Sequence, residues 1–172
     1  LSGKKNRILL TQHHWPTAPK LVRSALGGYL VQQPDDRMEG AADFDCVTKT
    51  AITDEQAADL AFALKLVKHT RSNTIVLARG GQLLASGTGQ TSRVDALNQA
   101  IDKARRMGFS LEGAAMASDA FFPFPDCVEI AHKAGITSVV QPGGSIKDNL
   151  SVAYCDENGL AMAMTGVRHF RH

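Results

Sequence analysis

The chain has 172 residues, 44% of them hydrophobic, and a formal net charge of +2. This length allows one domain with a buried core, or one domain with an N-terminal extension. The basic residues are scattered, so no long cationic stripe indicates a nucleic-acid surface, and no apolar run approaches the roughly 20 residues that a membrane-spanning helix needs.

The three cysteines are widely spaced and form no Cys-x-x-Cys pair. This pattern argues against a disulfide framework and against a thiolate zinc site, and it favours a reducing cytoplasm. The chain opens with Leu1 rather than with Met. We therefore expect the tail of a longer polypeptide, or a processed product.

Residues 1–50 are less regular than the rest and predict two short strands, Arg7–Thr11 and Gly27–Gln33, joined by a loop. His13 and His14 are adjacent, but neighbouring side chains point apart and no third ligand follows at helical spacing. A surface loop is therefore favoured over a metal site. We assign residues 1–50 to an N-terminal extension or to the end of a preceding subdomain, and residues 51–172 to the main domain.

Helix and strand signals alternate from Thr53 onward. A capping box, Thr53 with Gln56, predicts a helix that continues through Ala57–Val67 and ends near His69. Two apolar runs around a Gly-Gly turn predict a hairpin. Its strands are Thr74–Ala78 and Gln82–Ser86.

A second helix is predicted over Val94–Met107, because Ser92 and Asp95 cap its start and Gly108 stops it. Further helices are predicted over Pro125–Gly135 and Lys147–Asn158, between strands at Ala114–Ala117, Ile136–Val140 and Leu160–Thr165. This alternation implies parallel pairing of the last three strands, with the hairpin as an antiparallel addition. The predicted fold class is α/β, a three-layer α/β/α sandwich with a mixed sheet.

The loop Ser118–Asp126 concentrates three phenylalanines and two prolines between carboxylates. Pro123 and Pro125 lack a backbone N–H, so this segment cannot lie inside a helix or a central strand. A stiff aromatic loop is suited to gripping a flat ring, with the carboxylates taking ring N–H groups or a cation. The alternative is that the phenylalanines simply fill the core.

Unusual segments fall at strand ends or helix starts, where sites in such sheets gather. They are Ser72–Asn73, Gln90–Arg93, Ser118–Asp126 and Pro142–Ser145. The backbone of the last could cradle an anion or could be a tight turn with an N-cap. Arg93 lies in the first turn of a predicted helix, where the helix dipole disfavours a positive charge. It therefore either has an electrostatic partner elsewhere or is a solvated surface residue. Asn73 could present its amide to a planar heterocycle or could form a turn.

Five motifs carry a family resemblance. In chain order they are Lys68–Asn73, Gly87–Arg93, Ser118–Phe124, Gln141–Ser145 and Thr165–His172. Together they resemble the C-terminal part of the transformylase region in the bifunctional family that joins AICAR transformylase to IMP cyclohydrolase. The resemblance covers nearly the whole chain. It implies the second of two cytidine-deaminase-like subdomains, in a protein that works as a homodimer.

The resemblance implies transfer of a formyl group from 10-formyltetrahydrofolate to AICAR in IMP biosynthesis. By matching motif positions, the residues that contact AICAR would be Asn73, Phe121 and Arg168. Those that contact the folate would be Arg93, Pro123, Phe124 and Asp126. The family also binds potassium, and the matching positions are Val67, Thr70, Ser72, Asp119 and the backbone at His169.

The catalytic Lys-His pair of the family lies in a Phe-Lys-His-Val stretch upstream of these motifs, and Lys68-His69 belongs to a different motif. Loss of the histidine should cost about 10²- to 10⁴-fold in rate, so turnover by this chain alone is not expected. Zinc deamination is rejected, because the His-x-Glu and Pro-Cys-x-x-Cys signature is absent.

Three interpretations stay open. The chain is part of a transformylase whose base lies elsewhere, a non-catalytic folate or nucleotide-binding module, or mainly a dimerisation module. We favour the first, with AICAR and folate as small-molecule partners, a homodimer or the upstream subdomain as the protein partner, and no nucleic acid or membrane.

Overall fold

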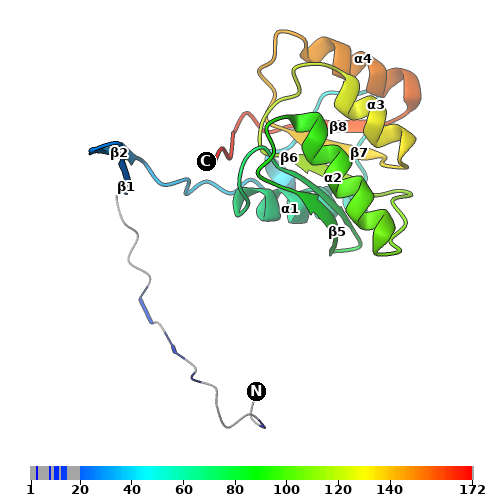
Figure 1. Ribbon diagram of the computed structural model, residues 1–172. Coiled ribbons are helices and arrows are strands. Elements are labelled where there is room, and N and C mark those ends of the chain that lie inside the picture. The colour runs from blue at the N-terminus through cyan, green and yellow to red at the C-terminus, as the bar shows by residue number, and fades with distance from the viewer. Residues whose placement is uncertain (1–2, 4–7, 9, 12, 15–19, 172) are drawn as a thin grey trace. The chain divides into compact units, whose positions relative to one another are not determined.

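The computed structural model describes residues 3, 8, 10–11, 13–14 and 20–171. The chain divides into two compact units, Leu1–Arg37 and Met38–His172 (Figure 1). Each unit is described by itself.

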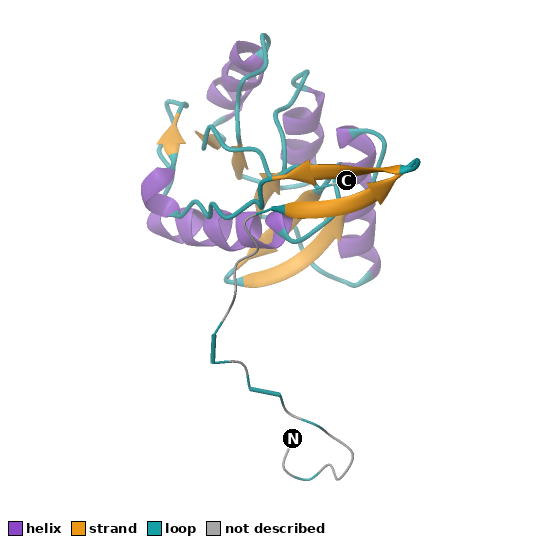
Figure 2. Ribbon diagram, turned by 90° about the vertical axis from the view of Figure 1, so that its left-hand side faces the viewer, coloured by secondary structure: helices purple, strands orange, loops and turns teal. Residues whose placement is uncertain are grey.

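The smaller unit contains an antiparallel hairpin of β1 (Leu21–Ala25) and β2 (Gly28–Gln32), drawn as a pair of arrows in Figure 2. Its two-residue turn, Leu26-Gly27, has φ angles of 45° and 81°, as the tight turns that match strand twist require. The strand predicted at Gly27–Gln33 is therefore confirmed. The strand predicted at Arg7–Thr11 includes positions outside the described residues, and its described members Ile8, Leu10 and Thr11 lie in no strand.

The larger unit is built on a six-stranded sheet in the order β3-β8-β7-β6-β4-β5. The strands are β3 (Asp45–Cys46), β4 (Ile75–Arg79), β5 (Gln82–Gly87), β6 (Ala115–Ser118), β7 (Ser138–Gln141) and β8 (Ala161–Met164). β6, β7 and β8 pair in parallel, whereas β3, β4 and β5 join by antiparallel pairing. The predicted mixed sheet is confirmed, including the parallel strands and the β4–β5 hairpin.

Helices cover both faces of this sheet (Figure 1). α1 (Asp54–Lys68) packs against one face. α2 (Arg93–Arg106), α3 (Asp126–Lys133) and α4 (Asp148–Asn158) pack against the other. The result is the predicted α/β/α sandwich, with a separate apolar core on each side of the sheet.

The helix caps act as the sequence predicts. The Thr53 hydroxyl accepts from the Gln56 N–H at 3.2 Å, and the Gln56 side chain accepts from the Thr53 N–H at 3.1 Å. Ser92 caps α2 by accepting from the Asp95 N–H at 3.1 Å. Each cap satisfies a donor that the first helical turn leaves without a partner.

The segment between the smaller unit and α1 belongs to the larger unit. It contains a short 3₁₀ helix η1 (Ala41–Asp43) and β3, whose two residues pair with Met164 and Ala163 of β8. β3 was not predicted, because two exposed residues offer no hydrophobic period. The structural units therefore separate at residue 38, whereas the sequence division was drawn after residue 50.

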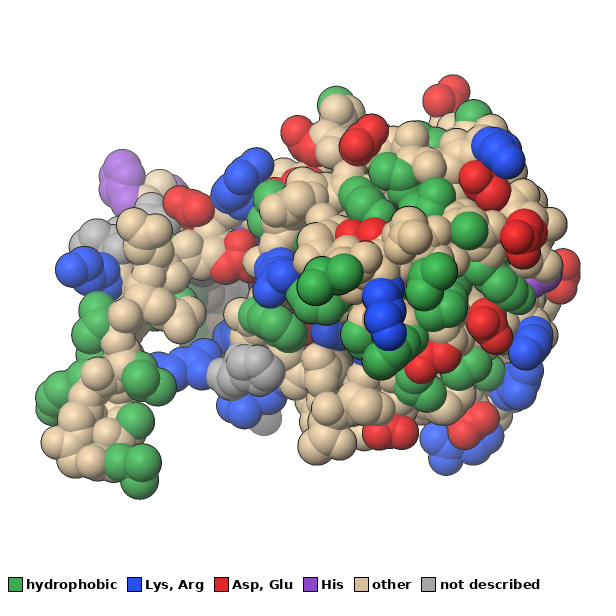
Figure 3. Space-filling view, turned by 90° about the horizontal axis from the view of Figure 1, so that it is seen from above, with side chains coloured by type: hydrophobic (Ala, Val, Ile, Leu, Met, Phe, Trp, Pro, Cys, Tyr) green, Lys and Arg blue, Asp and Glu red, His purple; other side chains and the backbone are tan. Residues whose placement is uncertain are grey.

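No described helix is long and apolar enough to cross a membrane. The face seen in Figure 3 mixes hydrophobic side chains with Lys, Arg, Asp and Glu.

Candidate functional site

The predicted site residues lie at the end of the sheet that is formed by the carboxyl ends of its parallel strands. β6 ends at Ser118, β7 at Gln141 and β8 at Met164, and β4 begins at Ile75 beside Ser118. The loops that leave these strands must therefore meet at one edge, as the topology predicts.

Arg93 is the centre of a buried polar network at this edge. Its Nη1 donates to Asp119 Oδ1 and, at 3.4 Å, to the Thr74 carbonyl, while its Nη2 donates to Asn73 Oδ1 at 2.8 Å. Arg93 is 8% exposed and Asp119 is 1% exposed. The electrostatic partner that Arg93 was expected to need is Asp119, and the solvated alternative was wrong.

Two atoms of this network have no hydrogen-bond partner among the described residues, Arg93 Nε and Asp119 Oδ2. The other carboxylate oxygen of Asp119 accepts from Arg93 and from the Thr74 N–H at 3.2 Å. Buried polar atoms are nearly always paired, so an orphaned carboxylate oxygen marks a place where a cation, a water or a ligand donor fits.

Asn73 is held with its amide in a fixed orientation. Its Oδ1 accepts from Arg93, and its Nδ2 donates to the Gln90 carbonyl at 2.9 Å. The backbones of Asn73 and Gln90 also pair in both directions, at 3.1 and 3.3 Å. The amide keeps one further N–H on Nδ2 and one lone pair on Oδ1 for a ligand.

The C-terminal tail folds back over this network. The His169 N–H donates to the Asp119 carbonyl at 3.1 Å, and Arg171 and Ser72 exchange two hydrogen bonds at 2.8 and 2.9 Å. The His169 side chain is 1% exposed and its Nε2 lies 2.9 Å from Glu39 Oε2. The tail is thus part of the folded unit rather than a frayed end.

The aromatic loop divides into a buried and an exposed part. Phe122 is fully buried in the core, and its N–H donates to Gln141 Oε1 at 2.9 Å, so the core-filling alternative is correct for this residue. Phe124 is 49% exposed, and the Lys147 ammonium lies 4.1 Å from its ring centroid. Pro123 is exposed as well. The exposed part can therefore meet a ligand.

Arg168 and Phe121 form a second cation–aromatic pair, with the guanidinium carbon 4.6 Å from the ring centroid. Arg168 is exposed, and within the described part of the chain its guanidinium makes no ion pair. A Cβ placed on Gly144 would lie 3.7 Å from Arg168 Nη2. An anion could approach this guanidinium beside a planar ring.

The Pro142–Ser145 turn is occupied by its own helix. The Asp148 carboxylate accepts from the Gly144 N–H at 2.7 Å and from the Ser145 N–H at 3.0 Å. Of the two alternatives, the tight turn is the one observed, because these N–H groups already have an anionic partner. The N-cap expected with it is absent, since Lys147 at the N-cap of α4 makes no side-chain cap hydrogen bond. Gly143 has a φ of 73°, a backbone conformation that favours glycine, and a Cβ there would also lie 2.7 Å from Met164 Sδ.

Asp126 begins α3, where its Oδ1 accepts from the Cys127 N–H at 2.8 Å. Burial raises the pKa of the Cys127 thiol from 9.0 to about 12, with a further upward contribution from the Asp126 charge and an opposing one from Arg93. A thiol with that pKa is protonated at neutral pH and is a poor nucleophile.

The residues expected around potassium lie at the end of α1 and along the network. The Val67 carbonyl accepts from the Thr70 hydroxyl at 2.7 Å. Ser72 is hydrogen-bonded to Arg171 of the tail, and the Asp119 carbonyl accepts from the His169 N–H. Asp119 Oδ1 also accepts from the Thr74 N–H. Carbonyl, hydroxyl and carboxylate oxygens are the donors that a hard cation prefers, and the orphaned Asp119 Oδ2 fits one. No group of His, Cys, Asp and Glu able to hold a metal ion occurs among residues 3, 8, 10–11, 13–14 and 20–171.

Sequence reasoning missed three residues that shape the site: Glu39, Gln141 and Asp148. Asp148 was readable, because Ser145-x-x-Asp148 has the spacing of a capping box. Glu39 lies in an irregular segment 130 residues before its partner, and no local pattern indicates that contact. Gln141 resembles any strand-end polar residue in sequence.

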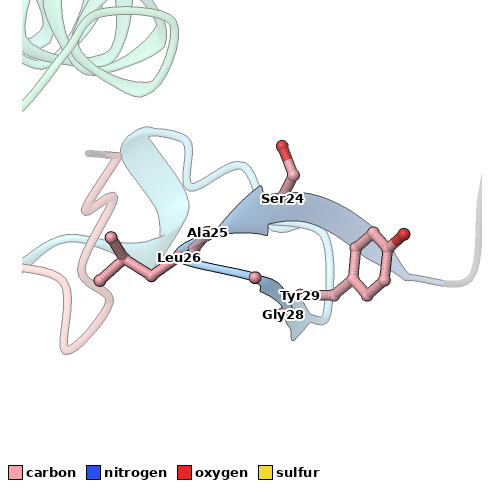
Figure 4. Close-up of a pocket in the computed structure, with 6 residues that line it drawn as sticks. Ser24, Ala25, Leu26, Gly28 and Tyr29 are labelled. Atoms are coloured by element: carbon pink, nitrogen blue, oxygen red, sulfur yellow. The ribbon is translucent and has the colours of Figure 1, made fainter.

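Other hollows lie away from this edge. One surrounds the β1–β2 turn and is lined by Ser24 through Tyr29, none of which is charged; Leu26 and Tyr29 extend from its backbone in different directions (Figure 4). Another lies between α2 and α3, around Asp102, Arg105 and Lys133. Neither contains a predicted site residue.

Two solved structures match part of this chain. A diaminohydroxyphosphoribosylaminopyrimidine deaminase/5-amino-6-(5-phosphoribosylamino)uracil reductase from Thermotoga maritima is 21% identical, with a TM-score of 0.42 over 62% of this chain and 34% of that one. The dCMP deaminase of cyanophage S-TIM5 is 17% identical, with a TM-score of 0.45 over 62% of this chain and 94% of that one.

Curated relatives are more similar in sequence. The bifunctional purine biosynthesis protein PurH of Bacteroides thetaiotaomicron is 60% identical over 172 residues, which are 100% of this chain and 34% of that protein. The PurH protein of Aquifex aeolicus is 48% identical over 176 residues, covering 100% of this chain and 33% of that protein. The chain therefore spans about a third of the length of these relatives. The family model described as the AICARFT/IMPCHase bienzyme matches residues 1–103, and the chain belongs to that family.

Proposed function

We propose that this chain is the C-terminal portion of an AICAR transformylase region, and that it binds AICAR and 10-formyltetrahydrofolate for formyl transfer in purine biosynthesis. Membership of the bienzyme family supports the pathway. A cytoplasmic location and a homodimeric assembly belong to the same proposal.

The observation that carries the proposal is the pairing of an oriented amide with an exposed guanidinium over an aromatic ring. AICAR is a planar imidazole with a carboxamide, an amine and a phosphate. Asn73 offers the donor and acceptor that a carboxamide needs, and its orientation is fixed by Arg93. The exposed guanidinium of Arg168, which lies over Phe121, offers two parallel N–H donors to the phosphate.

The folate is assigned to the exposed side of the aromatic loop. Pro123 and the half-exposed Phe124 offer apolar surface to a pterin or benzoyl ring, and Asp126 offers a carboxylate to ring N–H groups. Arg93 is 8% exposed, so only a small part of its surface could meet the folate. Its larger effect is on Asn73 and Asp119.

Potassium would be held by oxygens of Val67, Thr70, Ser72, Asp119 and the His169 backbone. Such an ion would supply a positive charge, which the unpaired Asp119 Oδ2 could balance. The chain's own hydrogen bonds already draw the end of α1, the β6 loop and the tail together. These hydrogen bonds between the chain's own residues orient the side chains that would bind the substrate.

The proton transfers of the reaction require a general base, and the Lys-His stretch that supplies it in the family does not occur in this sequence. Amine attack on the formyl carbon needs a base within hydrogen-bond reach, and no Phe-Lys-His-Val stretch occurs in the sequence. We assign the chain a binding and orienting role, and we place the base in another part of the protein.

The test is an AICAR formylation assay on this chain, alone and mixed with the first transformylase subdomain of a family member. We expect activity only in the mixture, and loss of most of it in Arg168→Ala. Arg106→Ala, which changes an exposed arginine on α2, is the matched control and should keep full activity. Activity of the chain alone would place the base within it, and inactivity of the mixture would count against the proposed function.

A further inference from the structure

A buried acid–imidazole pair joins two distant segments of the larger unit. Glu39 is 3% exposed and His169 is 1% exposed, with Oε2 and Nε2 separated by 2.9 Å. Carboxylates are rarely buried to this extent unless a partner satisfies them. The sequence gives no local reason for a carboxylate in the irregular segment Met38-Glu39-Gly40.

The pair fixes the tail from its side chain, while the backbone is fixed separately. The His169 N–H is bound to the Asp119 carbonyl, and Arg171 is bound to Ser72 in both directions. Arg168 directly precedes the buried His169. Its own side chain is exposed, and its guanidinium lies over the Phe121 ring. Its position therefore depends on the backbone that His169 holds.

We propose that Glu39 is a positioning residue that holds His169, and through it the tail backbone, so that the Arg168 guanidinium stays over Phe121. The consequence for AICAR rests on the proposed function, because it takes Arg168 as the ligand of the phosphate. A flexible arginine loses side-chain and backbone entropy when it binds an anion, and a tail held in place beforehand reduces that cost.

Hydrogen exchange on this chain tests the anchoring directly. In Glu39→Ala we expect the amides of His169 and Arg171 to exchange about tenfold faster or more, while amides inside α2 keep their rates, because the opening is local. Glu39→Gln retains an oxygen that can accept from Nε2–H and should restore most of the protection. Glu157→Ala, which removes an exposed carboxylate on α4, should change neither.

Unchanged tail amides in Glu39→Ala would overturn the proposal, as would a uniform rise across all helices, which would indicate a general loss of stability. Failure of Glu39→Gln to restore protection would also overturn it, because the hydrogen bond would then not be what anchors the tail.

Formylation kinetics in the mixture with the first subdomain test the consequence for AICAR. Glu39→Ala should raise the KM for AICAR about 2- to 30-fold, a range typical of coupling through neighbouring residues, with a smaller change in kcat. In an Arg168→Ala background the same substitution should have no further effect on KM. Faster tail exchange with an unchanged KM would overturn the positioning of Arg168. If the wild-type mixture does not formylate AICAR, the proposed function fails, while the exchange experiment still decides whether Glu39 anchors the tail.

Discussion

Arg93 and Asp119 place two opposite charges where almost no water reaches them. Each charge has lost most of its hydration, and the pair offsets that loss through hydrogen bonds to Asn73 and Thr74 as well as to each other. Removal of one partner therefore leaves the other as an uncompensated buried charge.

Arg93→Ala should lower the free energy of unfolding by about 3–5 kcal/mol, the usual cost of breaking a buried pair from one side. Urea denaturation followed by circular dichroism measures it. Arg106→Ala at the other end of α2 is the matched control, and it should stay within about 0.5 kcal/mol of wild type. Equal effects of the two substitutions would mean that the Arg93–Asp119 pair does not stabilise the fold.

The cysteines differ in accessibility. Cys46 is exposed, whereas burial, with help from neighbouring carboxylates, raises the pKa of Cys127 and Cys155 from 9.0 to about 12. Alkylation requires the thiolate. At pH 8, iodoacetamide should modify Cys46 in the native protein and reach the other two only in urea, as mass spectrometry would show. Modification of all three at one rate would contradict the burial of Cys127 and Cys155.

The same pKa shifts set the sign of a stability change with pH. Their contribution is fully present below about pH 9, where the unfolded thiols are protonated. It is lost as the pH rises toward 12, because the unfolded state releases protons that the folded state keeps. Wild type should lose more stability than Cys155→Ala between pH 9 and 11 in thermal melts, and parallel curves would count against the shift.

Site residues could be predicted from sequence where local chemistry was unusual. Arg93 opposes a helix dipole, and the Ser118–Asp126 loop holds two prolines among aromatics, so both stood out. Their hydrogen-bond partners could not be predicted, because the contacts of Arg93 with Asn73 and Asp119 span 20 and 26 residues. The Glu39–His169 contact is longer still.

At the scale of elements, Gly87 shows how closely β5 and α2 approach. A Cβ at this position would lie 1.8 Å from the Ala96 carbonyl oxygen, a separation that no side chain can adopt without moving the backbone. Only glycine allows the helix to lie this near to the strand, and α2 carries Arg93 into the site from its first turn.

Gly87→Ala should destabilise the protein by about 1–3 kcal/mol or more through overpacking, measured as the urea midpoint at constant slope. The matched control is Gly40→Ala. Gly40 has a φ of −112°, and a Cβ added to it meets nothing within 4 Å. A midpoint unchanged by Gly87→Ala would show that α2 can shift without cost.

Helices of this chain were predictable to within one or two residues, because capping residues mark their ends. Thr53 and Ser92 lie where the sequence expects a cap. Short strands were less predictable. β1 and β3 carry no alternating apolar pattern with a buried face, so their pairing depends on partners that sequence reasoning cannot see.

At the scale of the whole molecule, the larger unit has a complete sheet and an apolar core on each face. Its residues 38–50 take part in that structure through hydrogen bonds and apolar packing. β3 pairs with β8, the Thr48 hydroxyl accepts from the Met162 N–H at 2.9 Å, and Glu39 binds His169. Phe44 and Val47 also pack against the two cores.

Two truncations distinguish a boundary at residue 38 from one at residue 50. A chain that begins at Met38 keeps all of these contacts, so its Tm should lie within about 5 °C of the full chain, equivalent to roughly 1 kcal/mol. A chain that begins at residue 51 loses the β3 strand and leaves His169 buried without Glu39, so it should melt at a clearly lower temperature or fail to fold. Differential scanning calorimetry of both chains gives the comparison. Equal melting temperatures would mean that residues 38–50 are dispensable and that the division after residue 50 is the physical one. A large loss in both would mean that the smaller unit contributes to the stability of the larger one.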